Sequence, residues 1–344
     1  MVGIDISDRS IKVAEVKDSG ERRLRAVGWS AIPAEAVQRG FIRDVDAVAQ
    51  YLQDTFLKAS PVPVTGKTVV ASIPEVQSFI SVVEVPPMTD REMDEAVRWA
   101  VRENLPFDLD RVYIDWQPLG VTQAGKTQIL VGAAQREVVD PLLQVLDGLE
   151  LRVVGLELEG QSIVRSLLPL DSSGINGVLI VDLGATSSNL IFFNQGAMRF
   201  TTSVPKGGDD LTTALAGALS ISFEQAAEQK ALAGVSTKSQ NQQVSIPLRT
   251  ATRELVERIA VVAWDVSRGA QLQAILLAGG SANLPGIAEV FAEVFPGMPI
   301  QAGNPWTNLL TDGDADKAPL SAEDAMHFAT ALGLALRQPA EEYV

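Results

Sequence analysis

The sequence predicts an α/β protein of two domains, with a βαββαβ subdomain inserted into the first. Three observations lead to this prediction. Strand-type and helix-type patterns alternate along the 344 residues, a length that favours more than one core. A strand–turn–strand pattern that contains an aspartate occurs twice, around Asp5 and around Asp182. Between these copies, residues 78–158 have an element order of their own.

Residues 1–77 are expected to form the core of the first domain. Three strand patterns follow one another in VGIDIS, SIKVAEVK and RLRAVGWSAIP. The stretch DVDAVAQYLQDTFLKAS predicts a helix, because its apolar residues from Val45 to Phe56 recur at spacings of three and four. The strand TGKTVVASIP follows, so the predicted order is βββαβ.

Residues 78–158 are predicted to form the inserted subdomain. After the strand SFISVVEV, a helix begins at Thr89, where Glu92 completes a capping box, and ends at Pro106. The strands RVYIDWQPL and KTQILVGAA, the helix REVVDPLLQVLDGLE and a final strand LRVVGLELEG follow. The resulting order, βαββαβ, is that of a split βαβ unit.

The remaining residues are divided between the two domains. Residues 159–175 and a C-terminal helix over 321–338 are expected to complete the first domain. Residues 176–206 and 271–320 are expected to form the core of the second, and residues 207–270 its helical subdomain.

Composition excludes several classes of function. The net charge of −15 argues against a nucleic-acid partner, because affinity for a phosphate backbone depends on clustered Lys and Arg. The chain has no Cys and one His, His327, so disulfides and Cys- or His-rich metal sites are excluded. His327 lies in an apolar helical pattern and is expected to pack or cap. The early charges and the lack of a long uncharged apolar window predict neither a signal peptide nor a membrane-spanning helix, so we expect a cytoplasmic protein.

The repeated hairpin has the chemistry of a phosphate clamp. In GIDISDRSIKVAEV and in VDLGATSSNLIFF, an aspartate is followed by a knot of small and hydroxyl residues. Tight turns of this composition expose successive backbone N–H groups, which bind anions. The carboxylates of Asp5 and Asp182 would repel phosphate directly but can hold hydrated Mg²⁺, which prefers carboxylates together with substrate phosphates. Two such hairpins facing each other would hold a nucleotide from both sides.

A third motif follows a buried strand in AILLAGGSANLPGI. The paired glycines Gly279 and Gly280, followed by Ser281, let the backbone approach a flat ring or a ribose closely. A strand followed by two glycines is by itself also typical of an ordinary turn. The three motifs together, in this order, indicate a nucleotide site.

This combination resembles the actin-like ATPase superfamily, whose fold is ribonuclease H-like. Its two phosphate loops match residues 5–12 and 182–189, and its adenosine motif matches residues 276–286. The resemblance implies ATP with Mg²⁺ in a cleft between two domains. The implied nucleotide-binding residues are Asp5, Ser7, Arg9, Ser10, Lys12, Asp182, Gly184, Ala185, Thr186, Ser187, Gly207, Gly208, Glu228, Lys230, Gly279, Gly280 and Ser281. Asp5 and Asp182 would contact the metal through water.

Some positions leave alternatives open or depart from the superfamily pattern. Lys12 either points into the clamp or faces solvent, and Asp209 either lies near the phosphates or caps the next helix. Asp8 adds an acid to a phosphate turn, which is unfavourable unless it points away or meets a cation. The Glu-x-x-Lys pair near the ribose is imperfect, because Glu228 and Lys230 are two apart and share no helix face.

The motifs that predict the nucleotide-binding residues do not identify a residue that orients the attacking water for hydrolysis. Position along the chain suggests Glu159 and Gln161 as groups that could orient water. We therefore expect ATP binding with slow or no turnover.

Within the superfamily, the chain resembles the PilM family of type IV pilus assembly proteins, relatives of FtsA. The stretch PPMTDREMDEAVRWAVRENLPFDLDRVYIDWQPL, the sequence NPW at 304–306 and the position of the insertion, which is similar to an SHS2-like subdomain, carry this resemblance. It implies an adaptor that binds the N-terminal cytoplasmic peptide of a PilN-type inner-membrane protein. Such an adaptor would be recruited to the inner-membrane face, would act with the pilus motor ATPases indirectly, and would serve twitching motility.

A peptide of this kind needs an apolar groove, expected between the insertion and the first core. Met93, Val97 and Trp99 of the predicted helix are candidates for its wall, unless they pack against the insertion's own sheet. Two other functions share the fold: an FtsA- or MreB-like filament protein and a small-molecule kinase. A kinase would need an Asp base in a substrate pocket of the first domain.

Overall fold

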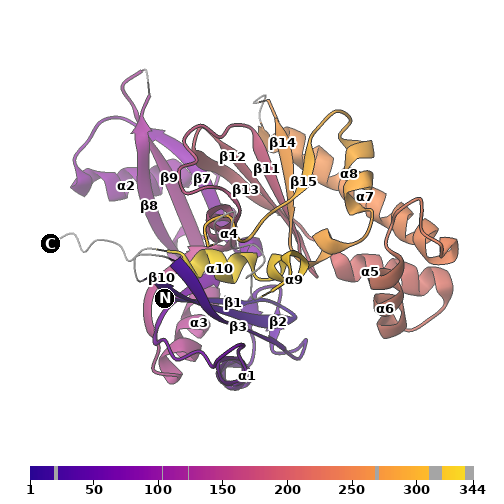
Figure 1. The fold of residues 1–344 in the computed structure, drawn as a ribbon. Helices are drawn as coiled ribbons and strands as arrows, with labels where there is room; N and C mark the ends of the chain where they lie inside the picture. Colours follow the sequence, from indigo (N-terminus) through magenta and orange to yellow (C-terminus); the bar gives the residue numbers. More distant parts are fainter. Residues whose placement is uncertain (19–21, 103, 123, 268–270, 310–319, 338–344) are drawn as a thin grey trace.

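The computed structural model describes the chain except residues 19–21, 103, 123, 268–270, 310–319 and 338–344. Parts of the predicted domain ranges, including 310–319 of the second core and 338 of the C-terminal helix, lie outside the described residues. Two mixed sheets organise the described chain, one of five strands and one of eight (Figure 1). The fold is α/β, as predicted.

The five-stranded sheet has the order β10-β6-β1-β2-β3. β1 pairs antiparallel with β2 and parallel with β6, and β6 pairs parallel with β10. Helices α1 and α3 lie on one face, and α10 and α4 lie on the other (Figure 1). The elements are β1 (Val2–Ile6), β2 (Ser10–Asp18), β3 (Arg22–Ala31), α1 (Val45–Leu57), β6 (Thr68–Ile73), α3 (Arg136–Gly148), β10 (Arg152–Leu158) and α4 (Glu159–Leu167), with a small hairpin of β4 (Val37–Gln38) and β5 (Phe41–Ile42).

The eight-stranded sheet has the order β15-β14-β11-β12-β13-β7-β9-β8. Its strands are β7 (Ser78–Val85), β8 (Val112–Val121), β9 (Thr127–Gln135), β11 (Val178–Leu183), β12 (Ser188–Asn194), β13 (Ala197–Val204), β14 (Ala274–Ala278) and β15 (Ile300–Ala302). The strands of the insertion continue the sheet of the second half through the pairing of Phe200 on β13 with Ser81 on β7.

The element order βαββαβ over residues 78–158 is present, but the strands do not form one sheet. β7 and β8 each pair with β9, whereas β10, assigned above to the insertion, pairs with β6 of the first core. Helix α3 likewise packs against α1 and β5. The sequence-based boundary is corrected accordingly: a strand pattern gives the strand but does not give its partner.

Helix α2 (Asp90–Val101) covers one face of the inserted strands. Its N-terminus carries the predicted capping box, in which the Thr89 N–H and hydroxyl both donate to Glu92, and the turn η2 (Leu109–Arg111) leads from it to β8. Met93, Val97 and Val101 pack against the sheet beneath. This packing anchors the helix on the side of the insertion that faces away from the first core.

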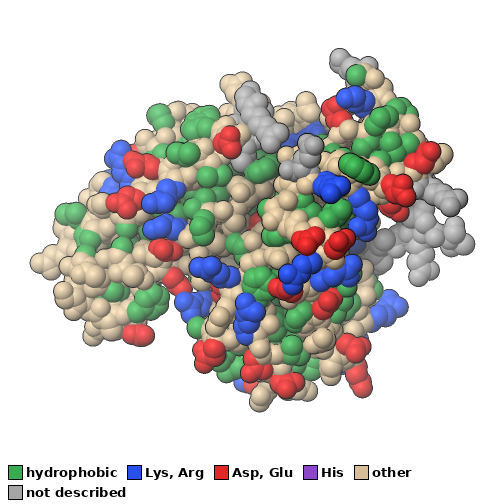
Figure 2. All heavy atoms as spheres, turned by 180° about the vertical axis from the view of Figure 1, so that it is seen from behind, with side chains coloured by type: hydrophobic (Ala, Val, Ile, Leu, Met, Phe, Trp, Pro, Cys, Tyr) green, Lys and Arg blue, Asp and Glu red, His purple; other side chains and the backbone are tan. Residues whose placement is uncertain are grey.

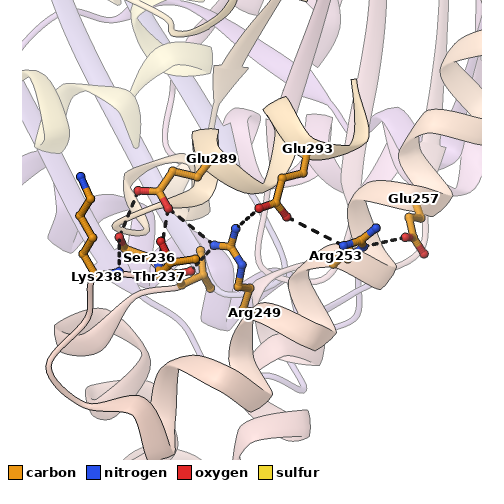
Figure 3. A network of polar contacts seen from close by, with 9 residues as sticks. Ser236, Thr237, Lys238, Arg249, Arg253, Glu257, Glu289 and Glu293 are labelled. Atoms are coloured by element: carbon orange, nitrogen blue, oxygen red, sulfur yellow. Dashed lines mark hydrogen bonds and ion pairs between the residues drawn. The ribbon is translucent and has the colours of Figure 1, made fainter. Parts of the chain in front are cut away.

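The second half ends in a group of helices. These are α5 (Gly208–Leu219), α6 (Phe223–Ala233), α7 (Gln242–Ser267) and α8 (Ile287–Val294). Arg249 on α7 joins them to the strand connections: it pairs with Glu289 and Glu293 on α8 and donates to the Val235 carbonyl (Figure 3). The Val235 N–H in turn donates to the Pro285 carbonyl, at 2.7 Å, so one network fixes the loop between α6 and α7.

The distribution of surface charge is uneven. Figure 2 shows the back of the molecule, where positive and negative side chains lie side by side over the body. On this face the end formed by α5 and α6 shows few charged side chains, and residues 211–223 contain none. Helices α5 and α6 still contribute to the negative net charge, because Asp209, Asp210, Glu224 and Glu228 outnumber Lys230.

The predicted C-terminal helix is two helices, α9 (Ala322–Met326) and α10 (Ala329–Ala335). α10 packs on β1 and α4, in the middle of the molecule between the two sheets (Figure 1). Gly3 permits this approach, because a Cβ there would lie 2.0 Å from the Ala331 carbonyl oxygen. No helix among the described residues is long and apolar enough to cross a membrane.

Candidate functional site

A cleft of about 620 Å³ lies between the two halves of the molecule. The turns of the two repeated hairpins, β1–β2 and β11–β12, both open into it. The aspartates occupy equivalent places, since Asp5 pairs with Lys12 and Asp182 with Asn189 across antiparallel strands. The sequence repeat is thus a structural repeat across one cleft.

The first hairpin aims its charged groups inward. Lys12 donates to Asp5 Oδ2 at 3.2 Å and lines the cleft, which settles the alternative left open for this residue. Ser72 on β6 donates to Asp5 Oδ1 at 3.1 Å. The turn is closed by Ser7, whose N–H and hydroxyl both donate to the Ser10 carbonyl.

Asp8 is directed at backbone donors outside the first hairpin. It accepts the N–H groups of Arg39, at 3.0 Å, and Gly40, at 2.8 Å, in the turn between β4 and β5. It also accepts the Thr186 hydroxyl of the second hairpin at 3.2 Å. The acid that departs from the superfamily pattern therefore has three donors, and these offset its charge at the phosphate turn.

The second hairpin is closely packed against the start of α5. The Gly208 N–H donates to the Gly184 carbonyl, and the Asp209 N–H to the Ala185 carbonyl, at 2.9 and 2.8 Å. A Cβ on Gly207 would lie 2.6 Å from both carbonyl oxygens. This contact requires glycine at position 207, which lies behind the cleft wall, whereas Gly208 forms part of the wall and faces Ser281 Oγ.

Three carboxyl groups face one another at the bottom of the cleft. Glu159, the first residue of α4, accepts the Asn189 amide at 3.1 Å and the Glu75 N–H at 3.2 Å. Burial raises the pKa of Glu159 well above its usual value, and the charges of Asp5 and Asp182 raise it further. Burial also raises the pKa of Asp182 to about 6, against the opposing effect of Lys12. Gln161, the other residue suggested for water, does not line the cleft.

The glycine motif after β14 forms the opposite wall. Gly279 has φ of +79°, and a Cβ there would lie 2.4 Å from Asp182 Oδ1. Gly280 faces the His327 ring, whose pKa is lowered by burial and by Lys12. Lys230 donates to the Gly208 carbonyl at 2.7 Å. The two glycines are thus required by close packing against Asp182 and His327, and both line the cleft.

Most of the residues expected from the sequence line the cleft. These are Asp5, Ser7, Arg9, Ser10, Lys12, Asp182, Gly184, Ala185, Thr186, Ser187, Gly208, Lys230, Gly279, Gly280 and Ser281. Glu228 does not, because it lies two positions from Lys230 on α6 and faces elsewhere. Trp29, Asn189 and Met326 also line the cleft and are not among the predicted residues. Trp29 lies there because β3 pairs it with Lys12, and the local sequence pattern does not give such a strand partner.

The acidic groups fit a hydrated metal better than a directly bound one. Among the described residues no three His, Cys, Asp or Glu side chains form a metal-binding cluster. Asp5 and Asp182 nevertheless interact across the cleft floor. Mg²⁺ keeps several waters in such sites, so these two carboxylates could hold it through water.

A second cavity, of about 340 Å³, lies between the insertion and the first core, and we name it the groove. Its lining residues come from β6, β8, β9, β10 and α4: Ile73, Tyr113, Ile114, Asp115, Trp116, Gln117, Leu130, Gly132, Ala133, Ala134, Leu156, Leu158 and Gln161. Met93 and Val97 do not line it, because they lie on the face of α2 that is buried against the insertion's own sheet. Trp99 is 71% exposed and also lies outside it. A cavity therefore lies between the insertion and the first core, and Met93, Val97 and Trp99 do not line it.

Two curated relatives match the chain over different lengths. FtsA, a cell division protein of Neisseria meningitidis, is 22% identical over 338 residues, which cover 85% of this chain and 80% of the relative. The ethanolamine utilization protein EutJ of Escherichia coli is 27% identical over 154 residues, 44% of this chain and 50% of that protein.

Two solved structures share the fold. A PilM–PilN type IV pilus biogenesis complex superimposes with a TM-score of 0.83 at 24% identity, over 97% of both chains. MreB5 of Spiroplasma citri bound to AMPPNP has a TM-score of 0.55 at 12% identity, over 96% of this chain and 93% of that one. The architecture is therefore that of the actin-like proteins. The model of the family described as type IV pilus assembly protein PilM matches residues 3–339. With this match over nearly its whole length, the chain belongs to the PilM family of type IV pilus assembly proteins.

Proposed function

We propose that the cleft binds ATP with Mg²⁺ and that the protein is a nucleotide-responsive adaptor of type IV pilus assembly. The observation that carries the nucleotide site is the meeting of the two Asp-containing hairpins at one cleft, opposite the glycine wall of β14. MreB5, which shares this fold, was solved with AMPPNP. In this proposal the hairpin N–H groups and Lys12 hold the phosphates, and Asp5 and Asp182 hold hydrated Mg²⁺.

In this proposal the carboxyl of Glu159, which lines the cleft, faces the terminal phosphate and its attacking water. A general base must be ionised to accept a proton, whereas burial favours the neutral form of this acid. We therefore propose that ATP is bound and turned over slowly at most. The pKa of Glu159 would limit the rate.

The partner in this proposal is a PilN-type inner-membrane protein, as in the PilM–PilN complex that shares the fold. Its N-terminal cytoplasmic peptide would lie in the groove, which is lined by Ile73, Leu130 and Leu158. Five consecutive residues of β8, Tyr113 to Gln117, also line the groove, and β8 is the edge strand of its sheet. An extended peptide can therefore bind through apolar side chains and through the strand edge.

Binding of this peptide would recruit the protein from the cytoplasm to the inner-membrane face, where it would connect the pilus platform to the motor ATPases.

The test is calorimetry with a synthetic N-terminal PilN peptide, with and without Mg-ATP. Micromolar binding that depends on nucleotide supports the adaptor. Binding of ATP without any binding of peptide overturns it and favours a filament protein or a kinase.

A further inference from the structure

The cleft and the groove are separated by the ends of two neighbouring strands. β6 and β10 run parallel, with Ile73 beside Leu158 in register, and both of these side chains line the groove. Directly after them, β6 enters the short turn η1 (Glu75–Gln77) and β10 enters α4. Glu159 at this point lines the cleft. The step from one cavity to the other is thus a single residue along β10.

Two buried glutamates bind these strand ends to each other reciprocally. The Glu75 N–H donates to Glu159 Oε2, and the Gly160 N–H donates to Glu75 Oε2, both at 3.2 Å. Each carboxyl therefore accepts a backbone donor from the segment of the other. A displacement of η1 relative to α4 must move the carboxyl of Glu159 or break one of these bonds.

Glu75 has a third contact, on the other half of the molecule. The Thr201 side chain, on β13 next to the residue that pairs with the insertion, lies close to the Glu75 carboxyl and lowers the pKa that burial raises. Glu75 is 4% exposed and lines neither cavity. Its surroundings are tight, since a Cβ on Gly160 would lie 3.2 Å from Glu75 Oε2 and from Thr201 Cγ2. A buried carboxyl costs free energy unless it is hydrogen-bonded, so this one must keep its partners.

We propose that Glu75 is a positioning residue that couples the groove to the cleft. A peptide in the groove presses on Ile73 and Leu158, and the reciprocal glutamate contact passes the displacement to the carboxyl of Glu159 beside Asp5 and Asp182. By linkage, the factor by which the bound peptide changes the affinity for nucleotide equals the factor by which bound nucleotide changes the affinity for the peptide. This inference rests on the proposed function and adds the side chain through which the two sites communicate.

The test measures the coupling factor, the ratio of the peptide dissociation constants without and with a non-hydrolysable Mg-ATP analogue. The probe is the synthetic PilN peptide, and calorimetry is performed on the full chain. We expect the native protein to show a factor in the range of about 5 to 150. Glu75→Ala is expected to bring the factor within about twofold of one, while each ligand alone still binds. Glu75→Gln, which keeps an acceptor for Gly160, is expected to retain most of the coupling.

Two further variants separate coupling from a loss of structure. Glu15→Ala removes another buried carboxyl, one that binds Arg25 and lines neither cavity, and it is expected to keep the native factor. Thr201→Val removes only the hydroxyl of the side chain that lies close to Glu75; it is expected to lower the factor and serves as the test if Glu75→Ala does not fold. An unchanged factor in Glu75→Ala, or an equal loss in Glu15→Ala, overturns the inference. A native factor of one with both ligands bound also overturns it, whereas absence of binding by either ligand overturns the proposed function itself.

Discussion

Arg9 and Asp209 are 200 residues apart in the sequence and form an ion pair across the mouth of the cleft. The guanidinium donates from Nε at 3.0 Å and from Nη2 at 2.8 Å to the same oxygen of the carboxylate. Together with the Thr186–Asp8 hydrogen bond, it joins the first hairpin to the second half. The two halves are thus held together at the site that a triphosphate would enter.

Neutralising Asp209 should strengthen nucleotide binding. Asp209→Asn removes a negative charge from the cleft and frees Arg9, so we expect ATP to bind about three- to tenfold more tightly. The free energy of unfolding should change by less than about 1 kcal/mol, because both partners are partly exposed. Calorimetry and chemical denaturation measure the two quantities. Arg9→Gln breaks the same pair but should weaken ATP binding; tighter binding in both variants would mean that the pair acts only as a clamp.

The hairpin aspartates should determine the metal dependence. Asp5→Asn and Asp182→Asn each remove a carboxylate that could hold Mg²⁺ through water, and we expect at least about tenfold weaker binding of Mg-ATP. Binding of ATP in EDTA should be unchanged or tighter, because the same carboxylates repel phosphate. The measurement is titration of ATP with and without Mg²⁺. Equal losses in both conditions would contradict a metal-holding role.

Binding of Mg-ATP should weaken as the pH falls through 6. Asp182 has its pKa raised to about 6, chiefly by burial, and only the ionised carboxylate attracts the metal. At pH 5 about one tenth of such a group is ionised, so the affinity should be about tenfold below its value above pH 7. Asp182→Asn should remove this part of the pH profile and leave that of the nucleotide itself.

The raised pKa of Asp182 gives the stability of the ligand-free protein a pH dependence opposite to that of Mg-ATP binding: the contribution of this group to stability increases as the pH falls. The folded state binds the proton of Asp182 more tightly than the unfolded state does. The contribution of this group to the free energy of unfolding is therefore largest below its ordinary pKa of 3.8 and decreases as the pH rises to about 6. Denaturation of Asp182→Asn should show a flatter dependence over this interval.

Substitution of Glu159 should separate turnover from binding. Glu159→Gln keeps the shape and an acceptor for the Glu75 N–H but cannot take a proton from water. We expect any steady-state phosphate release to fall at least about tenfold, with the affinity for Mg-ATP within about threefold of native. Gln161→Ala is the control, because that side chain faces the groove. Unchanged turnover in Glu159→Gln would exclude it as the base.

A side chain that fills the groove should weaken peptide binding without changing the affinity for ATP. A Cβ on Gly132 would lie 3.7 Å from Leu158, an ordinary contact, so the longer side chain of Gly132→Leu would occupy the groove. We expect the affinity for the PilN peptide to fall at least about tenfold and the affinity for ATP to remain within twofold. Trp99→Ala is the comparison. If it weakens the peptide more than Gly132→Leu does, the peptide binds on the exposed side of α2.

The hairpins could be predicted from the sequence because the signal is local. An apolar strand, an aspartate and a knot of small residues lie within fourteen positions, and they occur twice. The glycine wall was predictable for the same reason. By contrast, Asp8 meets Arg39 and Gly40, and Glu75 meets Gly160, through pairings of segments about 30 and 85 residues apart. The local sequence pattern does not show which segments far apart in the chain will contact each other.

Strand partners were the largest omission. The pattern of LRVVGLELEG predicts a strand, and β10 is one, but its place beside β6 depends on contacts with residues far away in the sequence. The side of α2 that is buried was similarly ambiguous. Met93 and Val97 are spaced for a helix face, and such a face can line a groove or cover a sheet; here it covers a sheet.

The continuity of the eight-stranded sheet has a mechanical consequence. Although residues 78–135 are inserted in the chain of the first half, the antiparallel pairing of Phe200 with Ser81 attaches their strands to the second. In a rigid-body rotation of one sheet against the other, the insertion would travel with the second half. The cleft lies between the first core and the second half, and the groove lies between the first core and the insertion, which is attached to the second half. Helix α4 contributes Glu159 to the cleft and Gln161 to the groove. One hinge movement would therefore change the width of both openings at once.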